Sequence, residues 1–356
     1  MTLAVMAFTL IAVGGGVRWV HIGLNRSRTA ALAMTAGQII AAGLMILLVH
    51  GPGYVARVPA FQLVGEGLAA ILLLWWLGPS GRRLPVELRW SVVRPLVSRA
   101  SALVVSALLG IVIYSAGFIF LRVFKGDAAV GYYTAAYTLV TFFLNLGTAY
   151  SMSLLPSLTR LGSARGEQHR LYHDAMAHVF AAGLPAAIGG SILAAPIIGL
   201  LFGPGFAPAS LPLGLLVWCI PLCLLRDVPL MALQAGGKEG RVLRITVGAA
   251  GLGLALNAVL IPRWGIAGAA VATVATEAVR LGLALVFLRR EGYALTGLSR
   301  FWRSLVAGGA MAGLLLTVGP DSIWLAIPLG ALGYLAVLTV LGGLRFRKGA
   351  LPALTV

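Results

Sequence analysis

The sequence predicts an all-α, polytopic integral membrane protein with about eleven transmembrane helices. Of its 356 residues, 60% are hydrophobic and 10% are charged, whereas a soluble domain of this length needs a more highly charged surface. Apolar runs long enough to cross a bilayer recur along the chain. The formal net charge of +17 would indicate a nucleic-acid partner in a soluble protein. Here the basic residues fall in the breaks between apolar runs, where they report topology, and no nucleic-acid partner is expected.

The predicted spans are separated by short polar breaks. Internal prolines such as Pro185 and Pro196 in the sixth span and Pro221 in the seventh indicate kinks, which membrane helices tolerate. In chain order the predicted spans are residues 2–23, 30–50, 59–78, 98–122, 130–157, 174–202, 208–235, 241–262, 266–288, 302–318 and 322–343.

Residues 242–289 predict an antiparallel helical hairpin. Two apolar runs are joined by the short segment Pro262-Arg263-Trp264-Gly265, whose proline and glycine are typical of a turn. Several residues of the two runs are small enough to let the two backbones approach closely. They are Gly248, Gly251, Gly253, Gly268, Ala269 and Ala272.

The breaks between spans alternate in charge, and this predicts orientation. One set holds nineteen basic residues and the other holds four, so the richer set is expected to be cytoplasmic. The C-terminus is then inside and Met1 outside. An odd number of spans with an outside start suggests that residues upstream of Met1 are missing. The longest break, 79–97, is expected to be a cytoplasmic linker, either solvated or partly formed by a helix at the membrane surface around Trp90.

The run from Ala128 to Leu161 resembles a helix of the Wzx-type lipid-linked oligosaccharide flippases, members of the MATE-like multidrug/oligosaccharidyl-lipid/polysaccharide exporter superfamily. Relatives open this helix with G-Y-x-x-A and close it with L-P-x-L-x-R. Here the first motif is Gly131, Tyr132 and Ala135, and the second is Leu155, Pro156, Leu158 and Arg160. The blocks 197–209, 233–245 and 256–277 match the family's later helices in order and spacing.

This resemblance implies a domain plan. Relatives usually have two six-helix bundles and two further helices, so this chain is expected to show a partial MATE-like two-bundle architecture. Residues 1–78 would be a partial N-terminal bundle of three helices, 79–97 a cytoplasmic linker, 98–289 a complete C-terminal six-helix bundle, and 302–343 the last two helices. The family's first three helices would be absent. Many relatives carry an acidic residue where this chain has Gly117, which puts coupling through that carboxylate in doubt.

Charged side chains inside spans are costly and are therefore candidates for function. A diphosphate-linked lipid needs cationic groups, and arginine offers bidentate phosphate geometry. Structural ion pairs or helix-end charges are the alternative for each arginine, Arg122 above all. Asp227 and Arg226, being adjacent on a helix, are expected to serve different neighbours. The predicted substrate-binding residues are Arg99, Arg226, Arg280, Tyr114 and Asn145, and the predicted coupling or gating residues are Glu66, Asp227 and Glu277.

No metal site, cofactor or enzymatic activity is predicted. His169 and His173 have no third ligand nearby, Cys219 and Cys223 are expected to be packing residues, and no catalytic motif is present. The resemblance implies a flippase for a polyprenyl-diphosphate-linked oligosaccharide in the bacterial inner membrane. Its expected partners are that substrate, membrane lipids, a polysaccharide polymerase and glycosyltransferases. The alternatives are a multidrug or metabolite exporter of the same superfamily, or a non-transporting fragment.

Overall fold

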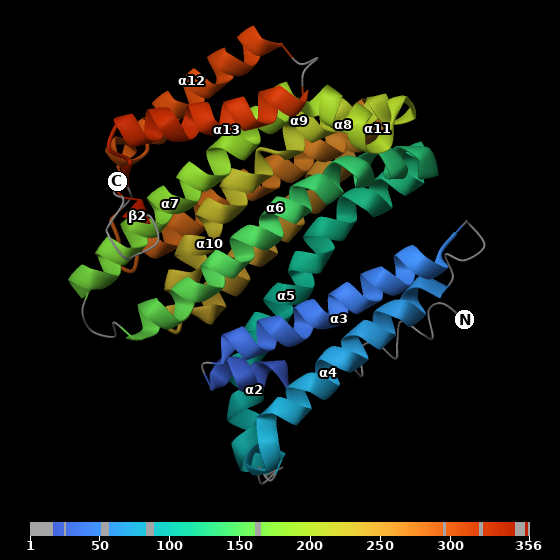
Figure 1. Cartoon of the computed structure of the whole chain (residues 1–356). Helices are drawn as coiled ribbons and strands as arrows, with labels where there is room; N and C mark the ends of the chain where they lie inside the picture. The colour runs from blue at the N-terminus through green and yellow to red at the C-terminus, as the bar shows by residue number, and fades with distance from the viewer. Residues whose placement is uncertain are drawn as a thin grey trace. The chain divides into compact units, whose positions relative to one another are not determined.

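The computed structural model describes residues 17–24, 26–50, 57–82, 89–160, 165–294, 297–319, 323–345 and 353–354. The all-α prediction is confirmed, with one addition, a two-residue antiparallel pairing of β1 (Leu344–Arg345) with β2 (Ala353–Leu354). The helices shown in Figure 1 are α2 (Arg18–Gly23), α3 (Ser27–Leu48), α4 (Val58–Arg82), α5 (Trp90–Lys125), α6 (Asp127–Arg160), α7 (Arg165–Ile192), α8 (Ala194–Phe202), η2 (Pro204–Ala209), α9 (Ser210–Leu216), α10 (Cys219–Ala235), α11 (Glu239–Arg289), η3 (Leu298–Arg300), α12 (Trp302–Val318) and α13 (Ile323–Val340).

The chain forms two compact units, Met1–Val92 and Val93–Val356. Most of the first predicted span, 2–23, lies outside the described residues. α5 begins at Trp90, inside the stretch predicted to be a linker, and runs unbroken through the predicted span 98–122. This part of the predicted linker is thus helical and continuous with the span that follows, whereas the linker itself and the division into a partial and a complete bundle stay predictions.

In the first unit, α3 and α4 pack with their backbones in contact. A Cβ placed on Gly37 would lie 2.4 Å from the carbonyl oxygen of Gly65, and one placed on Gly65 would lie 2.5 Å from that of Gly37. No side chain fits between the helices at this crossing. Next to it, Gln38 Nε2 donates a hydrogen bond to Glu66 Oε1 at 2.9 Å.

In the second unit, α10 is the central helix and contacts α6, α7 and α11 (Figure 1). Most of its residues are buried. Pro185 and Pro229 lie inside α7 and α10, and Gly183 of α7 packs against the ring of Pro221, since a Cβ on this glycine would lie 2.9 Å from the proline Cα. Small residues and prolines thus form the contact between these two helices.

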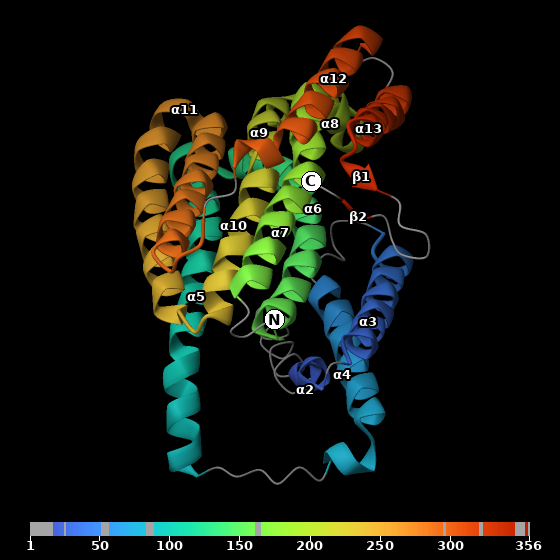
Figure 2. The ribbon, with the colours of Figure 1, turned by 90° about the vertical axis from the view of Figure 1, so that its left-hand side faces the viewer.

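The predicted antiparallel hairpin is confirmed in α11, which doubles back on itself (Figure 2). The turn is made at Gly265, whose φ of 58° and ψ of −130° are not helical and are readily adopted by glycine. Gly253 packs against Thr276, and the Cβ position of Gly268 lies 2.3 Å from the carbonyl oxygen of Leu260. Gly251, in contrast, faces open space. At the open end of the hairpin, Glu291 pairs with Arg241 and with Lys238 (3.6 Å).

The last two helices, α12 and α13, pack on each other and on α7. They share a small hydrophobic core with Leu193, separate from the large core of the bundle. Tyr334 of α13 donates a hydrogen bond to the carbonyl oxygen of Ala181 in α7 at 2.8 Å. This bond joins α13 to the bundle, which α12 also contacts through α7.

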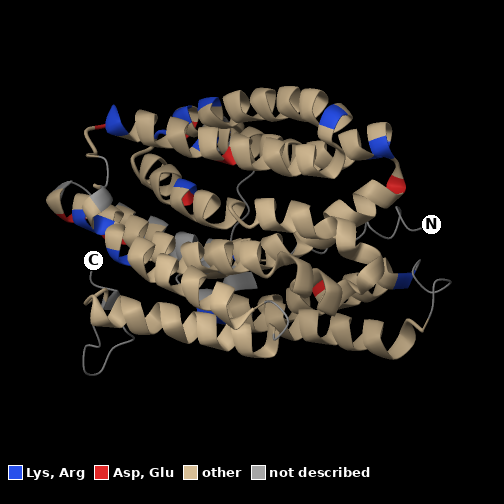
Figure 3. Ribbon diagram, turned by 90° about the horizontal axis from the view of Figure 1, so that it is seen from above, with Lys and Arg blue, Asp and Glu red and all other residues tan. Residues whose placement is uncertain are grey.

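The chain is a multi-pass membrane protein. Seven helices within the described residues are long and apolar enough to cross a bilayer. α11 counts once among them although it contains both arms of the hairpin, and α12 is slightly shorter at 17 residues. Lys and Arg lie mainly toward the helix ends, and long stretches carry no charge (Figure 3). The predicted total of eleven spans stays a prediction.

Candidate functional site

A network of four charged side chains lies inside the second unit. Arg226 of α10 donates to Asp227 Oδ1 through Nε (3.0 Å) and Nη2 (2.7 Å), and through Nη1 to Glu277 Oε2 of α11. Arg280 Nη1 lies 3.5 Å from the other oxygen of the same glutamate, Oε1. Two arginines are thus balanced by two carboxylates.

The network is buried, and this explains its pairing. Side-chain exposure is 8% for Arg226, 10% for Arg280 and 1% for Glu277, and it rises to 19% for Asp227. A charge removed from water and left alone in the membrane would cost several kcal/mol, so each needs a partner of opposite sign. Glu277 and Arg280 face the same neighbour because residues three apart lie on one helix face.

One expectation about this network is wrong. Arg226 and Asp227 were expected to serve different neighbours, yet the guanidinium folds back onto the adjacent carboxylate with two of its nitrogens. The arginine side chain is long enough to reach back around the helix, so the angle between adjacent positions does not separate the pair. Asp227 and Glu277 therefore share one cation.

The hydrogen bonding of the network is incomplete. Arg280 Nε and Glu277 Oε1 are buried, and neither has a hydrogen-bond partner among the described residues. The Cys223 thiol lies one turn from Arg226 and accepts a 3.5 Å contact from its Nη1. A buried guanidinium with an unused donor retains the capacity to bind an acceptor.

Aromatic residues of α5 and α6 lie beside the network. Tyr114 is within electrostatic range of Arg226, Glu277 and Arg280, and its ring meets that of Tyr137 edge to face at 6.3 Å between centroids. Phe118 and Tyr133 continue the cluster. One predicted substrate residue, Tyr114, therefore lies in the same part of the second unit as three of the charged candidates.

Apart from Tyr114, the residues of this aromatic cluster were not among the predicted site residues. The available signal was the i, i+4 spacing of Tyr114 with Phe118 and of Tyr133 with Tyr137, which places each pair on one helix face. The Tyr133 hydroxyl is 3.0 Å from Thr273 Oγ1 of α11.

Buried polar groups also surround Gly117, the position at which the resemblance to the flippases implies an acidic residue. Asn257 is buried and donates to the Gly253 carbonyl at 2.7 Å. Its Oδ1 has no partner among the described residues and lies 3.6 Å from the position that a Cβ on Gly117 would take. The Tyr133 hydroxyl is 3.5 Å from the same position.

The remaining predicted residues lie elsewhere. Glu66 belongs to the first unit and is bonded to Gln38. Asn145 is exposed on α6. Arg122 forms an exposed ion pair with Asp127 at 3.1 Å. This agrees with the alternative given for this arginine, a charge at a helix end. Arg99 lies in α5 at a position whose side chain is outside the described part of the structure.

Within the described residues no group of three or more His, Cys, Asp and Glu side chains could hold a metal ion. The ring of His169 packs on that of Tyr293 at 4.5 Å between centroids. Cys219 and Cys223 are free and buried, in keeping with their predicted packing role.

The sequence of the chain is similar to those of known proteins. Residues 3–211 match the model of a family described as polysaccharide biosynthesis protein. In Haloferax volcanii, the probable flippase AglR is 27% identical over 205 residues, which are 56% of this chain and 43% of AglR. The probable low-salt glycan biosynthesis flippase Agl15 is 26% identical over 284 residues, covering 74% of this chain and 59% of that protein. The chain thus spans about half the length of the curated relatives it matches.

A solved structure supports the fold. The inward closed conformation of the lipid II flippase MurJ aligns with 94% of this chain and 71% of its own, with a TM-score of 0.74 and 13% sequence identity. At that identity the likeness establishes a shared fold. The relatives by sequence are transporters rather than enzymes.

Proposed function

We infer a transport function from the family to which this chain belongs, the polysaccharide biosynthesis proteins, which are Wzx-like members of the MATE-like exporter superfamily. We propose that the chain flips a polyprenyl-diphosphate-linked oligosaccharide across the bacterial inner membrane for surface polysaccharide assembly. The observation that carries this proposal is the buried network of Arg226, Asp227, Glu277 and Arg280. A lipid diphosphate cannot cross hydrocarbon with its charges bare, and two guanidinium groups supply the required cations.

The network suggests how the arginines serve the substrate. The protein's own carboxylates neutralise both guanidinium groups. An entering diphosphate would replace a carboxylate, and Arg280 is the first candidate to receive it because its Nε has no partner within the described chain. Asp227 is the most exposed member, so it is the carboxylate expected to release its arginine most easily.

The carboxylates would then act in gating. Release of Glu277 from Arg226 breaks the ion pair between α10 and the second arm of α11, and release of Asp227 frees Arg226 to change partner, so substrate binding and helix position are linked. In alternating-access transporters, helix bundles rock about a binding site that opens in turn to the two sides of the membrane. Glu66 could contribute a second linkage in the first unit by exchanging Gln38 for another partner.

The sugar would meet aromatic and polar groups. Tyr114 lies beside the charged network and offers a ring face and a hydroxyl, both of which suit a carbohydrate. Asn145 is exposed and keeps its amide available. Arg99 is the third candidate for the diphosphate.

Binding and transport by purified protein would test the proposal. The protein, reconstituted in liposomes, would be offered undecaprenyl-diphosphate carrying a short glycan, and flipping would be followed by accessibility of the sugar to an impermeant oxidant. Arg280→Gln should weaken binding about tenfold, equivalent to about 1.4 kcal/mol. The matched control is Arg244→Gln on the same hairpin, because Arg244 is exposed and lies over the Phe287 ring.

Two further variants separate binding from structure. Arg280→Lys keeps a cation against Glu277 but removes the guanidinium fork; if Arg280 only stabilises the bundle through this ion pair, the variant should bind and flip nearly as well as the original. Under the proposal it folds but loses affinity for the diphosphate. Unchanged binding by Arg226→Gln and Arg280→Gln, singly and together, would remove both arginines from the mechanism.

A cationic-drug exporter is the competing transport function. Such a site needs an excess of negative charge, whereas here two carboxylates face two arginines. The anionic lipid is therefore preferred. As partners we propose the polymerase and glycosyltransferases that would consume and supply the lipid-linked glycan, and we propose that the C-terminus is cytoplasmic.

A further inference from the structure

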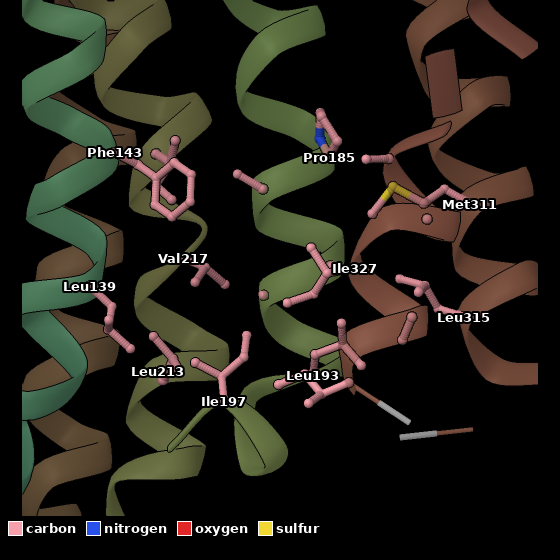
Figure 4. A pocket seen from close by; sticks show the side chains of 18 of the residues that line it. Leu139, Phe143, Pro185, Leu193, Ile197, Leu213, Val217, Met311, Leu315 and Ile327 are labelled. Carbon is pink, nitrogen blue, oxygen red and sulfur yellow. The ribbon is translucent and has the colours of Figure 1, made fainter. Parts of the chain in front are cut away.

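A wholly apolar cavity of about 530 Å³ lies between the bundle and the last two helices. Its walls come from α6, α7, α8, α9, α10, α12 and α13, and every residue that lines it is apolar. Figure 4 shows side chains from several of these helices gathered around the space, among them Leu139, Pro185, Ile197, Val217, Met311 and Ile327.

The cavity lies between two hydrophobic cores of the second unit. On one side Leu213 and Val217 belong to the large core of the bundle. On the other, Met311 and Leu315 belong to the small core of α12 and α13. Across this seam the Tyr334 hydroxyl bonds to the carbonyl oxygen of Ala181. The packing between the two cores is therefore incomplete along the cavity.

The walls cannot simply move together and close the space. The Cβ position of Gly308 in α12 lies 2.7 Å from Ile188 Cδ1 of α7, and that of Gly189 in α7 lies 3.0 Å from Met311 Cε of α12. The bundle and the last two helices are therefore already in contact beside the cavity. A packed interior leaves few such voids empty, because their lining loses dispersion contacts.

The cavity is suited to hydrocarbon and not to water. Its lining offers no side chain that could bond a water molecule, and apolar cavities stay dry. Leu200, Leu201 and Ile327 line it and remain about half exposed. In a chain that spans a membrane, such exposed apolar residues face lipid, so the space can be entered sideways from the bilayer.

We propose that this cavity binds an acyl chain of a membrane phospholipid, which joins α12 and α13 to the bundle as a structural lipid. Phospholipid chains greatly outnumber isoprenoid carriers in a bilayer, and a cavity with no polar group has no means of selecting the rarer molecule. Mass action then favours the acyl chain. On the predicted topology the bound lipid belongs to the outer leaflet. The proposal does not depend on the transport function.

A photoactivatable phosphatidylcholine with a diazirine in the middle of one acyl chain tests this in the full chain. After irradiation in lipid–detergent micelles, labelled peptides are mapped by mass spectrometry. Labelling is expected in α7 and α13 around the cavity. Ala331→Phe places a ring at the cavity and should remove most of this label. Ala336→Phe on the same helix is the control, because this alanine is exposed and is not part of the lining.

Thermal unfolding supplies a second readout. Adding phosphatidylcholine to delipidated protein should raise the Tm by several degrees, since a ligand that binds the folded state stabilises it. Ala331→Phe and Ala186→Leu, from opposite walls, should lose most of this increment, whereas Ala336→Phe should keep it. Equal increments in all variants, or absence of label at the cavity, would overturn the proposal. So would loss of the label on adding a small mole fraction of undecaprenol, because the occupant would then be an isoprenoid chain.

Discussion

Glu277 of α11 accepts a hydrogen bond from Arg226 of α10, although the two residues are 51 positions apart in sequence. The glutamate also faces Arg280 on its own helix. This single carboxylate therefore holds two buried cations at the contact between the central helix and the hairpin.

Removal of this carboxylate should destabilise the bundle strongly. Glu277→Ala leaves Asp227 as the one remaining carboxylate of the network for two buried arginines, and breaking a buried ion pair on one side costs about 3–5 kcal/mol. Thermal unfolding of the purified protein should show a large drop in Tm. The control is Asp127→Asn, which removes a carboxylate from an exposed pair and should leave the Tm unchanged. A small effect of Glu277→Ala would mean that water already reaches the network.

The turn of α11 should tolerate no side chain at Gly268. A Cβ at this position would lie 2.3 Å from the Leu260 carbonyl oxygen and 2.7 Å from its carbonyl carbon, so Gly268→Ala should cost about 1–3 kcal/mol as an overpacked contact. Gly251→Ala in the same hairpin meets nothing within 4 Å and should be neutral or slightly stabilising, since alanine favours helix over glycine. Similar melting temperatures for the two variants would contradict the close approach at the turn.

The crossing of α3 and α4 offers a second matched pair of glycines. Gly65→Val would force the side chain into the Gly37 carbonyl oxygen, at 2.5 Å from the Cβ position, and should separate the two helices. Gly67→Val, on the same helix, has open space around its Cβ position. Disulfide trapping between cysteines placed across α3 and α4 should fall for Gly65→Val and persist for Gly67→Val. Equal trapping in both would show that the helices meet elsewhere.

Topology can be tested with two lysines. The charge asymmetry predicts that Lys238 is cytoplasmic and Lys125 periplasmic. In a background lacking Cys219 and Cys223, cysteine at position 125 should react with an impermeant maleimide in intact cells, and cysteine at position 238 should react after the cells are opened. Labelling of position 238 from outside would reverse the orientation.

The hairpin of α11 could be predicted from sequence because its signals are local. Pro262 and Gly265 mark the turn, and the runs on either side have the length of a span. The start of α5 at Trp90, in contrast, could not be predicted from the sequence. Its first turns contain Arg94 and Pro95, which are typical of a connector, yet the helix continues through them.

The charged residues of the buried network could be named from the sequence, whereas the ion pairs and hydrogen bonds between them could not. Buried charges are rare enough to stand out in an apolar sequence, so Arg226, Asp227, Glu277 and Arg280 could all be named. The pairing depends on rotamers, and a long arginine can reach an adjacent residue as easily as a distant one. The apolar cavity could not be predicted from the sequence, because its walls come from seven helices and its lining residues resemble those of any other part of a span.

The bond between Arg226 and Asp227 has a consequence for how the protein is made. Glu277 is synthesised 51 residues after Arg226, so α10 leaves the ribosome before that partner exists. Asp227 is the next residue, and it already takes two of the guanidinium's donors. A helix that carries its own counter-charge enters the bilayer at a lower cost than one with a lone cation. Asp227→Asn should therefore reduce the yield of membrane-inserted protein, before any effect on the finished bundle is measured.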